Sequence, residues 1–137
     1  MAPAPGTTRR EALRLVGALL LALVGGVVAA LAPEAVTPGS PDSAALVWRI
    51  GAVGGVIAAL LVAASALAAL GGRDGTGPAR AAVATGWLTV GVLVLGAVHG
   101  VVVGVPAGDA VGVSFIVAIP ASGAAVLGLM GRRRSEA

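Results

Sequence analysis

His99 has the clearest chemical potential in this sequence, because it is the only histidine and lies inside an uncharged run, residues 81–108. If that run crosses a membrane, an ionisable side chain within it is costly to bury and is a functional hypothesis by default. Thr85 and Thr89 precede His99 at spacings that place the three residues on one face of a helix. This polar face could line a path for a proton or a solute. Alternatively, the imidazole could bond to a neighbouring helix while the threonines bond to carbonyls of their own helix.

The residues around this face favour the structural alternative. None of the expected membrane spans contains an aspartate or glutamate. No carboxylate is therefore available inside a span to continue a proton relay from His99. Acid–base catalysis needs paired groups within hydrogen-bond reach, and a metal site needs several ligands. The chain also has no cysteine, which excludes a thiolate nucleophile or a cysteine-bound metal. We therefore predict no catalytic residue, metal site or cofactor, and we expect a protein that is not an enzyme.

The glycine-rich segment 71–80 is the other candidate for a binding site, since glycine-rich loops that open a helix can cradle phosphate. It lacks the Lys-Ser/Thr pair of a P-loop, and no strand precedes it. We interpret it as a linker between two helices.

The hydropathy of the chain indicates which structural elements hold these candidate residues. The chain of 137 residues is 58% hydrophobic and only 11% charged, against about 25% charged in an average soluble domain. Charges separate long apolar runs, and about 20 apolar residues suffice to span a bilayer as a helix. We predict one integral membrane domain over residues 1–137, an all-α four-helix transmembrane bundle. The expected spans are approximately 12–33, 44–71, 81–105 and 110–131.

Arginine placement predicts the orientation of the bundle. If the chain threads four times, Arg49 alone falls on one side, and the other eight arginines fall opposite: Arg9, Arg10, Arg14, Arg73, Arg80, Arg132, Arg133 and Arg134. Cytoplasmic segments carry the arginine excess, so both termini are expected inside, in a bacterial plasma membrane. Arg132, Arg133 and Arg134 should also attract anionic lipid, by about 1 kcal/mol each.

The first run could instead be a cleaved signal peptide, since Ala30-Leu31-Ala32 resembles a cleavage site. Pro33 would then follow the scissile bond, where proline normally blocks cleavage. We favour a retained membrane anchor.

Three residues are predicted to lie at the membrane–water interface. Trp48 and Trp87 lie within about two helical turns of opposite membrane faces, as aromatic belt residues do. Arg49 can extend its side chain to the headgroups, or pair with Glu34, Asp42 or Asp109 on the same side.

Small residues recur at every fourth position of the expected spans, which would let helices approach closely in lipid. The predicted helix-packing positions are Gly96, Gly100 and Gly104 on the third span and Gly51 and Gly55 on the second. A chain this rich in alanine and glycine also produces such spacings by chance. Residues 17–31 align with 91–105, which is compatible with two tandem helical hairpins.

The Gly75-Thr76-Gly77 triplet ahead of Arg80, the glycine-rich third span and the segment Leu95-Gly96-Ala97-Val98-His99 resemble a pattern in small four-pass membrane proteins of high-GC Gram-positive bacteria. The resemblance covers about residues 71–104, and Pro78-Ala79 departs from the pattern. It implies the same topology and transfers no functional residue.

These observations lead to a functional expectation with one alternative. We expect a non-enzymatic structural, interaction or accessory protein that packs against itself or a larger membrane partner, with no nucleic-acid partner. The alternative is a small transporter or channel subunit that uses the face of His99, Thr85 and Thr89.

Overall fold

The computed structural model describes the backbone of residues 5–36 and 42–136, and the side chains of residues 8–31 and 43–130. Four α-helices make up this part of the chain: α1 (Pro5–Val36), α2 (Asp42–Leu70), α3 (Thr76–Val102) and α4 (Ala107–Glu136). Each contains a segment long and apolar enough to cross a membrane. The predicted all-α fold is confirmed, with four helices that are each long and apolar enough to span a membrane.

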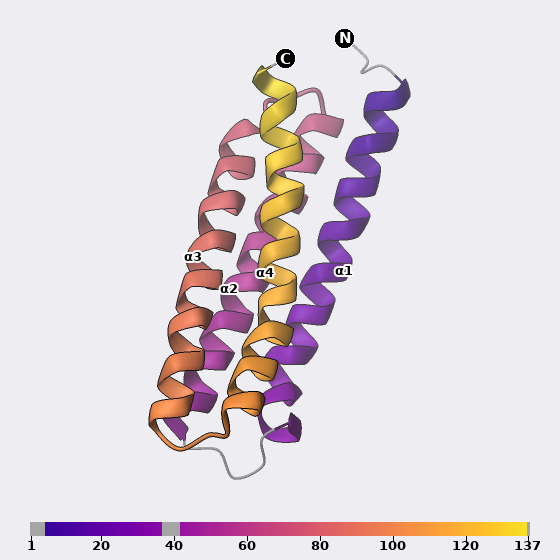
Figure 1. Cartoon of the computed structure of the whole chain (residues 1–137). Helices are drawn as coiled ribbons and strands as arrows, with labels where there is room; N and C mark the ends of the chain where they lie inside the picture. The colour runs from indigo at the N-terminus through magenta and orange to yellow at the C-terminus, as the bar shows by residue number, and fades with distance from the viewer. Residues whose placement is uncertain (1–4, 37–41, 137) are drawn as a thin grey trace.

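The helices run alternately up and down, so the start of α1, the α2–α3 connection and the end of α4 lie at one end of the bundle (Figure 1). Helices α2 and α4 contact each other and both remaining helices. Within the described residues, α1 and α3 make no contact with each other. The α2–α4 pair therefore forms the centre of the bundle, with α1 and α3 on either side.

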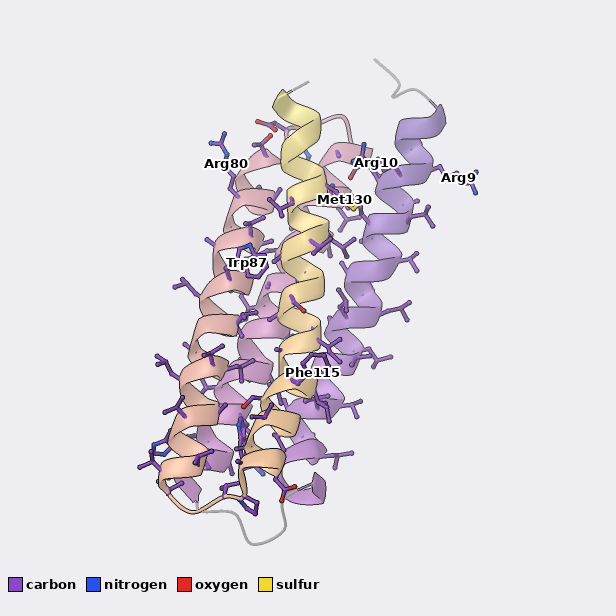
Figure 2. The ribbon with its side chains drawn as sticks, viewed as in Figure 1. Arg9, Arg10, Arg80, Trp87, Phe115 and Met130 are labelled. Carbon is purple, nitrogen blue, oxygen red and sulfur yellow. The ribbon has the colours of Figure 1, made fainter. Side chains whose placement is uncertain are left out.

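Arg9, Arg10 and Arg80 mark the end of the bundle that carries the chain termini (Figure 2). We call this the arginine end. Arg14 and Arg73 belong to the same end, because they lie on the first turns of α1 and on the α2–α3 connection. Arg49 lies near the opposite end, on the early part of α2.

Glycines in left-handed conformation terminate two of the helices. Gly72 has φ +74° and follows α2, where the Arg73 N–H donates to the Ala68 carbonyl. Gly104 has φ +101° and follows α3, where the Val105 N–H donates to the Gly100 carbonyl at 2.8 Å. These hydrogen bonds satisfy carbonyls that the end of a helix leaves open, and glycine adopts this conformation without a steric penalty.

The interior of the bundle consists mainly of small side chains. One core cluster, toward the end of the bundle opposite the arginine end, is built around Trp48 and Leu93. The other is built largely from alanines of all four helices, including Ala18, Ala59 and Ala124. Only 22% to 44% of each span is buried, and large leucine, valine and isoleucine side chains cover the outward faces. An outer surface of this kind suits lipid better than water.

Candidate functional site

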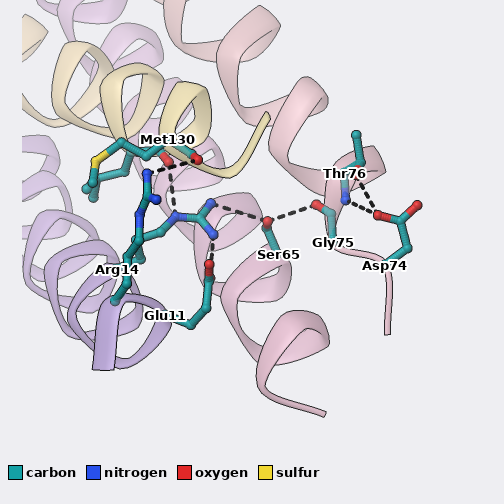
Figure 3. Close-up of polar contacts among 9 residues, drawn as sticks. Glu11, Arg14, Ser65, Asp74, Gly75, Thr76 and Met130 are labelled. Atoms are coloured by element: carbon teal, nitrogen blue, oxygen red, sulfur yellow. Dashed lines mark hydrogen bonds and ion pairs between the residues drawn. The ribbon is translucent and has the colours of Figure 1, made fainter. Parts of the chain in front are cut away.

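A buried ion pair lies near the arginine end. Glu11 and Arg14 on α1 are 1% and 2% exposed, and the Arg14 Nη1 donates to the Glu11 carboxylate at 2.5 Å (Figure 3). The two residues are one helical turn apart, so one face of α1 presents both. This spacing is visible in the sequence. Sequence reasoning used Arg14 only as an indicator of topology and missed the pair.

Arg14 also connects α1 to two other helices. Its Nε donates to the Leu127 carbonyl of α4 at 3.1 Å, and its Nη2 donates to the Ser65 hydroxyl of α2 at 3.3 Å. Ser65, itself 1% exposed, donates in turn to the Gly75 carbonyl just before α3, at 2.8 Å. The chain of bonds therefore ties all four helices together at one level of the bundle (Figure 3).

This network holds the helices together through the hydrogen bonds of Arg14. Every nitrogen of the Arg14 guanidinium has a protein acceptor, and the carboxylate beside it is neutralised. A buried charge persists only when it is paired and hydrogen-bonded in this way. The described residues contain no cluster of three or more side chains that could hold a metal ion.

Beside the network, a pocket of about 250 Å³ opens between α1 and α4. It is lined by Arg9, Arg10, Leu13, Arg14, Leu127 and Met130. Arg9 and Arg10 are exposed, and the Arg10 Nη2 lies 3.5 Å from the Met130 carbonyl. Figure 2 shows Arg10 directed toward Met130 and Arg9 directed outward from α1. The arrangement presents positive charge at the mouth of the pocket.

The residues of the predicted polar face do not form a common site. Thr89 is buried, and its Oγ1 donates to the Thr85 carbonyl at 2.7 Å, as the structural alternative predicts. His99 is half-buried, and its Nε2 lies 3.2 Å from the Ser43 hydroxyl of α2, a contact with a neighbouring helix. The rise of an α-helix separates Thr89 from His99 by about 15 Å along the axis, so they share a face without touching.

The interfacial prediction is wrong for Trp48. This indole is fully buried in the core cluster, and its Nε1 donates to the Ser114 hydroxyl of α4 at 3.1 Å. The buried donor finds its partner inside the protein and has no need of the membrane interface. Trp87 is 50% exposed on α3, so its interfacial role stays a prediction. Arg49 is half-buried, and the side chains of Glu34 and Asp42, two of its proposed partners, lie outside the described ones.

The predicted helix-packing glycines divide among different contacts. A methyl group added to Gly96 would lie 2.7 Å from Val47 of α2, and one added to Gly100 would lie 3.3 Å from Ala110 of α4. Gly51 faces Leu93 of α3, whereas Gly55 faces the backbone of α4 at Ala121. Gly104 is not on a packing face, because it terminates α3 and has open space around its Cα. The prediction that Gly104 is a helix-packing position is therefore wrong.

Two further glycines, Gly86 and Gly128, lie against the backbone of a neighbouring helix between α3 and α4, and the sequence did not single them out. A methyl group on Gly86 would lie 2.7 Å from the Ala121 carbonyl oxygen and 2.9 Å from Ala125. One on Gly128 would lie 3.0 Å from the Ala79 carbonyl oxygen. These two glycines let the backbones of α3 and α4 approach each other directly.

No protein-family model, curated protein or solved structure matches this chain. The function must therefore be argued from the geometry alone.

Proposed function

We propose that this chain is a non-enzymatic membrane protein, a four-helix accessory or interaction subunit that works through the outer faces of its helices. The observation that carries the proposal is the contrast between its inside and its outside. Among the described residues, the buried polar side chains of Arg14, Trp48 and Thr89 bond within the bundle. The outward faces carry large apolar side chains, such as Leu88 at 71% and Leu95 at 70% exposure.

The proposed orientation places the arginine end in the cytoplasm. Arg9, Arg10 and Arg80 lie together at the end where the chain begins and ends, which supports the arginine rule applied to the sequence. The bacterial plasma membrane remains the proposed location. Contacts are most extensive between α1 and α2 and between α3 and α4, which supports two tandem helical hairpins.

The transport alternative has less support. Three grooves described on this part of the chain are lined by residues other than His99, Thr85 and Thr89. His99 bonds at the rim of the bundle, and Thr89 bonds to its own helix. We therefore propose no solute path through this face.

Site-specific photocrosslinking in native membranes tests the proposal. A photoreactive amino acid would replace, one at a time, the exposed residues Leu23, Leu88, Leu95 and Phe115, which sample α1, α3 and α4. An interaction subunit should give a discrete protein adduct from one face and only lipid adducts from the others. Lipid adducts at every position would contradict the interaction role. In liposomes, a pH-dependent leak that His99→Gln and His99→Leu both abolish would support transport instead.

A further inference from the structure

The junction of α1 and α4 combines a basic pocket with a long apolar groove. Arg9 and Arg10 both line the pocket at the arginine end, and the Arg10 side chain is directed toward Met130 within it, whereas that of Arg9 is directed outward from α1 (Figure 2). Directly along the same helix pair runs a groove with a volume of about 630 Å³. Its lining includes Gly17, Leu20 and Val24 of α1 and Ser122, Gly123 and Val126 of α4. Leu127 lines both spaces, so the pocket and the groove adjoin at this residue.

The groove lies where α1 and α4 separate. Gly17 and Gly123 both line it, and a leucine of the facing helix packs on each of them, Leu127 on Gly17 and Leu21 on Gly123. Helix α1 leans away from α4 toward the arginine end (Figure 1). The α1–α4 junction is the least extensive of the helix contacts. From Leu13 to Val24 the helix rises by about 16 Å, close to the roughly 15 Å depth of one hydrocarbon leaflet.

The charges at the pocket leave a net positive mouth. Glu11 neutralises Arg14, whose nitrogens are all engaged within the protein. Arg9 and Arg10 are exposed, and none of the described residues that line the pocket is acidic. Arginine is well suited to phosphate because its planar guanidinium offers several donors in a fixed geometry. The apolar groove below suits a hydrocarbon chain.

We propose that the α1–α4 junction is a binding site for one anionic phospholipid, with its phosphate at Arg9 and Arg10 and one acyl chain in the groove. The lipid fills the space that the sparse α1–α4 contact leaves open, and Arg14 holds the two helices at the spacing that admits it. This site is distinct from attraction of bulk lipid by the arginines at residues 132–134.

Native mass spectrometry of the detergent-purified full chain tests the site. The protein would be supplied with phosphatidylglycerol or phosphatidylcholine, and retained lipid would be counted per protein. We expect several-fold more phosphatidylglycerol than phosphatidylcholine on the native chain. The double variant Arg9→Gln/Arg10→Gln should abolish this preference, whereas Arg73→Gln/Arg80→Gln should retain it. The second pair removes the same charge from the same end of the bundle, and neither of its residues lines the pocket.

A second matched pair tests the groove. Leu20 lines it, whereas Leu23 is equally a leucine of α1, is 65% exposed and does not line it. Leu20→Trp should reduce phosphatidylglycerol retention several-fold, and Leu23→Trp should leave it unchanged. Glycerol 3-phosphate, which has the headgroup chemistry without acyl chains, should not displace the lipid at equal concentration.

Three results would overturn the proposal: equal retention of both lipids by the native chain, equal losses in the two arginine double variants, or effective displacement by glycerol 3-phosphate. Unchanged retention in Leu20→Trp would also overturn it, since the acyl chain would then lie elsewhere. Circular dichroism and thermal unfolding in detergent would show that each variant is folded before its lipid is counted. The crosslinking experiment on the outer faces reads a different property, so the two proposals can fail separately.

Discussion

Arg14 shows at the residue scale how a charged side chain can lie inside an apolar bundle. Its guanidinium has a carboxylate, a hydroxyl and a backbone carbonyl as partners, each from a different helix. The cost of removing the charge from water is offset only while all of these partners are present. The pair therefore contributes specificity to the arrangement of α1, α2 and α4 more than it contributes net stability.

This view leads to a prediction for the ion pair. Glu11→Leu should lower the free energy of unfolding by about 3–5 kcal/mol, because it leaves a buried guanidinium without its counter-charge. Combining it with Arg14→Met should recover part of that loss, since neither charge then remains buried. Reversible unfolding by dodecyl sulfate in mixed micelles measures the free energy of unfolding of Glu11→Leu, of Arg14→Met and of the double variant. Strict additivity of the two single losses would show that the residues do not interact.

At the element scale, the contact between α3 and α4 depends on which glycines lie on it. Gly86 meets the backbone of α4, whereas Gly91, less than two turns further on, has open space where a side chain would be. Both glycines are interior positions of the same helix. The space available for a side chain differs between Gly86 and Gly91 because α4 packs against the first and not against the second.

Gly86→Ala and Gly91→Ala should therefore have opposite effects. The first should destabilise the protein by about 1–3 kcal/mol, because the added methyl group forces α3 and α4 apart. The second should be neutral or stabilise by up to about 1 kcal/mol, because alanine favours helix over glycine. Thermal unfolding in detergent compares the two directly. Similar losses for both would mean that helix propensity, and not close packing, governs these positions.

The start of α3 has its own electrostatic feature. Asp74 accepts hydrogen bonds from the hydroxyl and the backbone N–H of Thr76, the first residue of α3. These bonds, with a smaller contribution from Arg80, lower the pKa of the Asp74 carboxyl from its ordinary value of 3.8. A lowered pKa in the folded state stabilises the protein above pH 3.8, and this contribution is lost as the pH falls through the folded-state pKa.

A carboxyl titration by NMR spectroscopy checks this feature. The Asp74 carboxyl should titrate below 3.8 in the native chain, and Thr76→Ala should move its midpoint upward, because the side-chain hydrogen bond is the largest cause. Arg80→Gln should move it less. An unchanged midpoint in Thr76→Ala would show that the hydroxyl does not hold the carboxylate.

For the whole molecule, the testable property is its orientation in the membrane. The native chain has no cysteine, so single cysteines can be introduced without background. Gly77 on α3 and Ala107 on α4 are both exposed and lie at opposite ends of the bundle. Thr37 lies outside the described residues and is less suitable.

Gly77→Cys should be protected from an impermeant thiol reagent in intact cells, and Ala107→Cys should be labelled. The reason is the arginine excess at the Gly77 end, which is retained in the cytoplasm. Labelling after membrane disruption is the control for reactivity at each site. The reverse pattern in intact cells would place the arginine end outside and refute the proposed orientation.

The sequence by itself determined the number of helices, because long uncharged apolar runs can satisfy their backbone groups in lipid only as helices or closed barrels. It also indicated a linker between two helices at the glycine-rich segment 71–80, where Gly72 adopts the left-handed conformation that favours glycine. The bond between Thr89 and the Thr85 carbonyl is equally local and equally predictable.

The tertiary structure alone decided which residues face one another. Trp48 and Trp87 look alike in the sequence, yet one is buried against Ser114 and the other is half exposed. Gly86 and Gly104 both occur in a glycine-rich stretch, yet one packs on α4 and the other ends a helix. In lipid, apolar residues gain little from facing inward, so hydrophobic patterning does not mark the buried face of a helix. The partners of Arg14 come from distant parts of the chain, and only the packing of the helices brings them together.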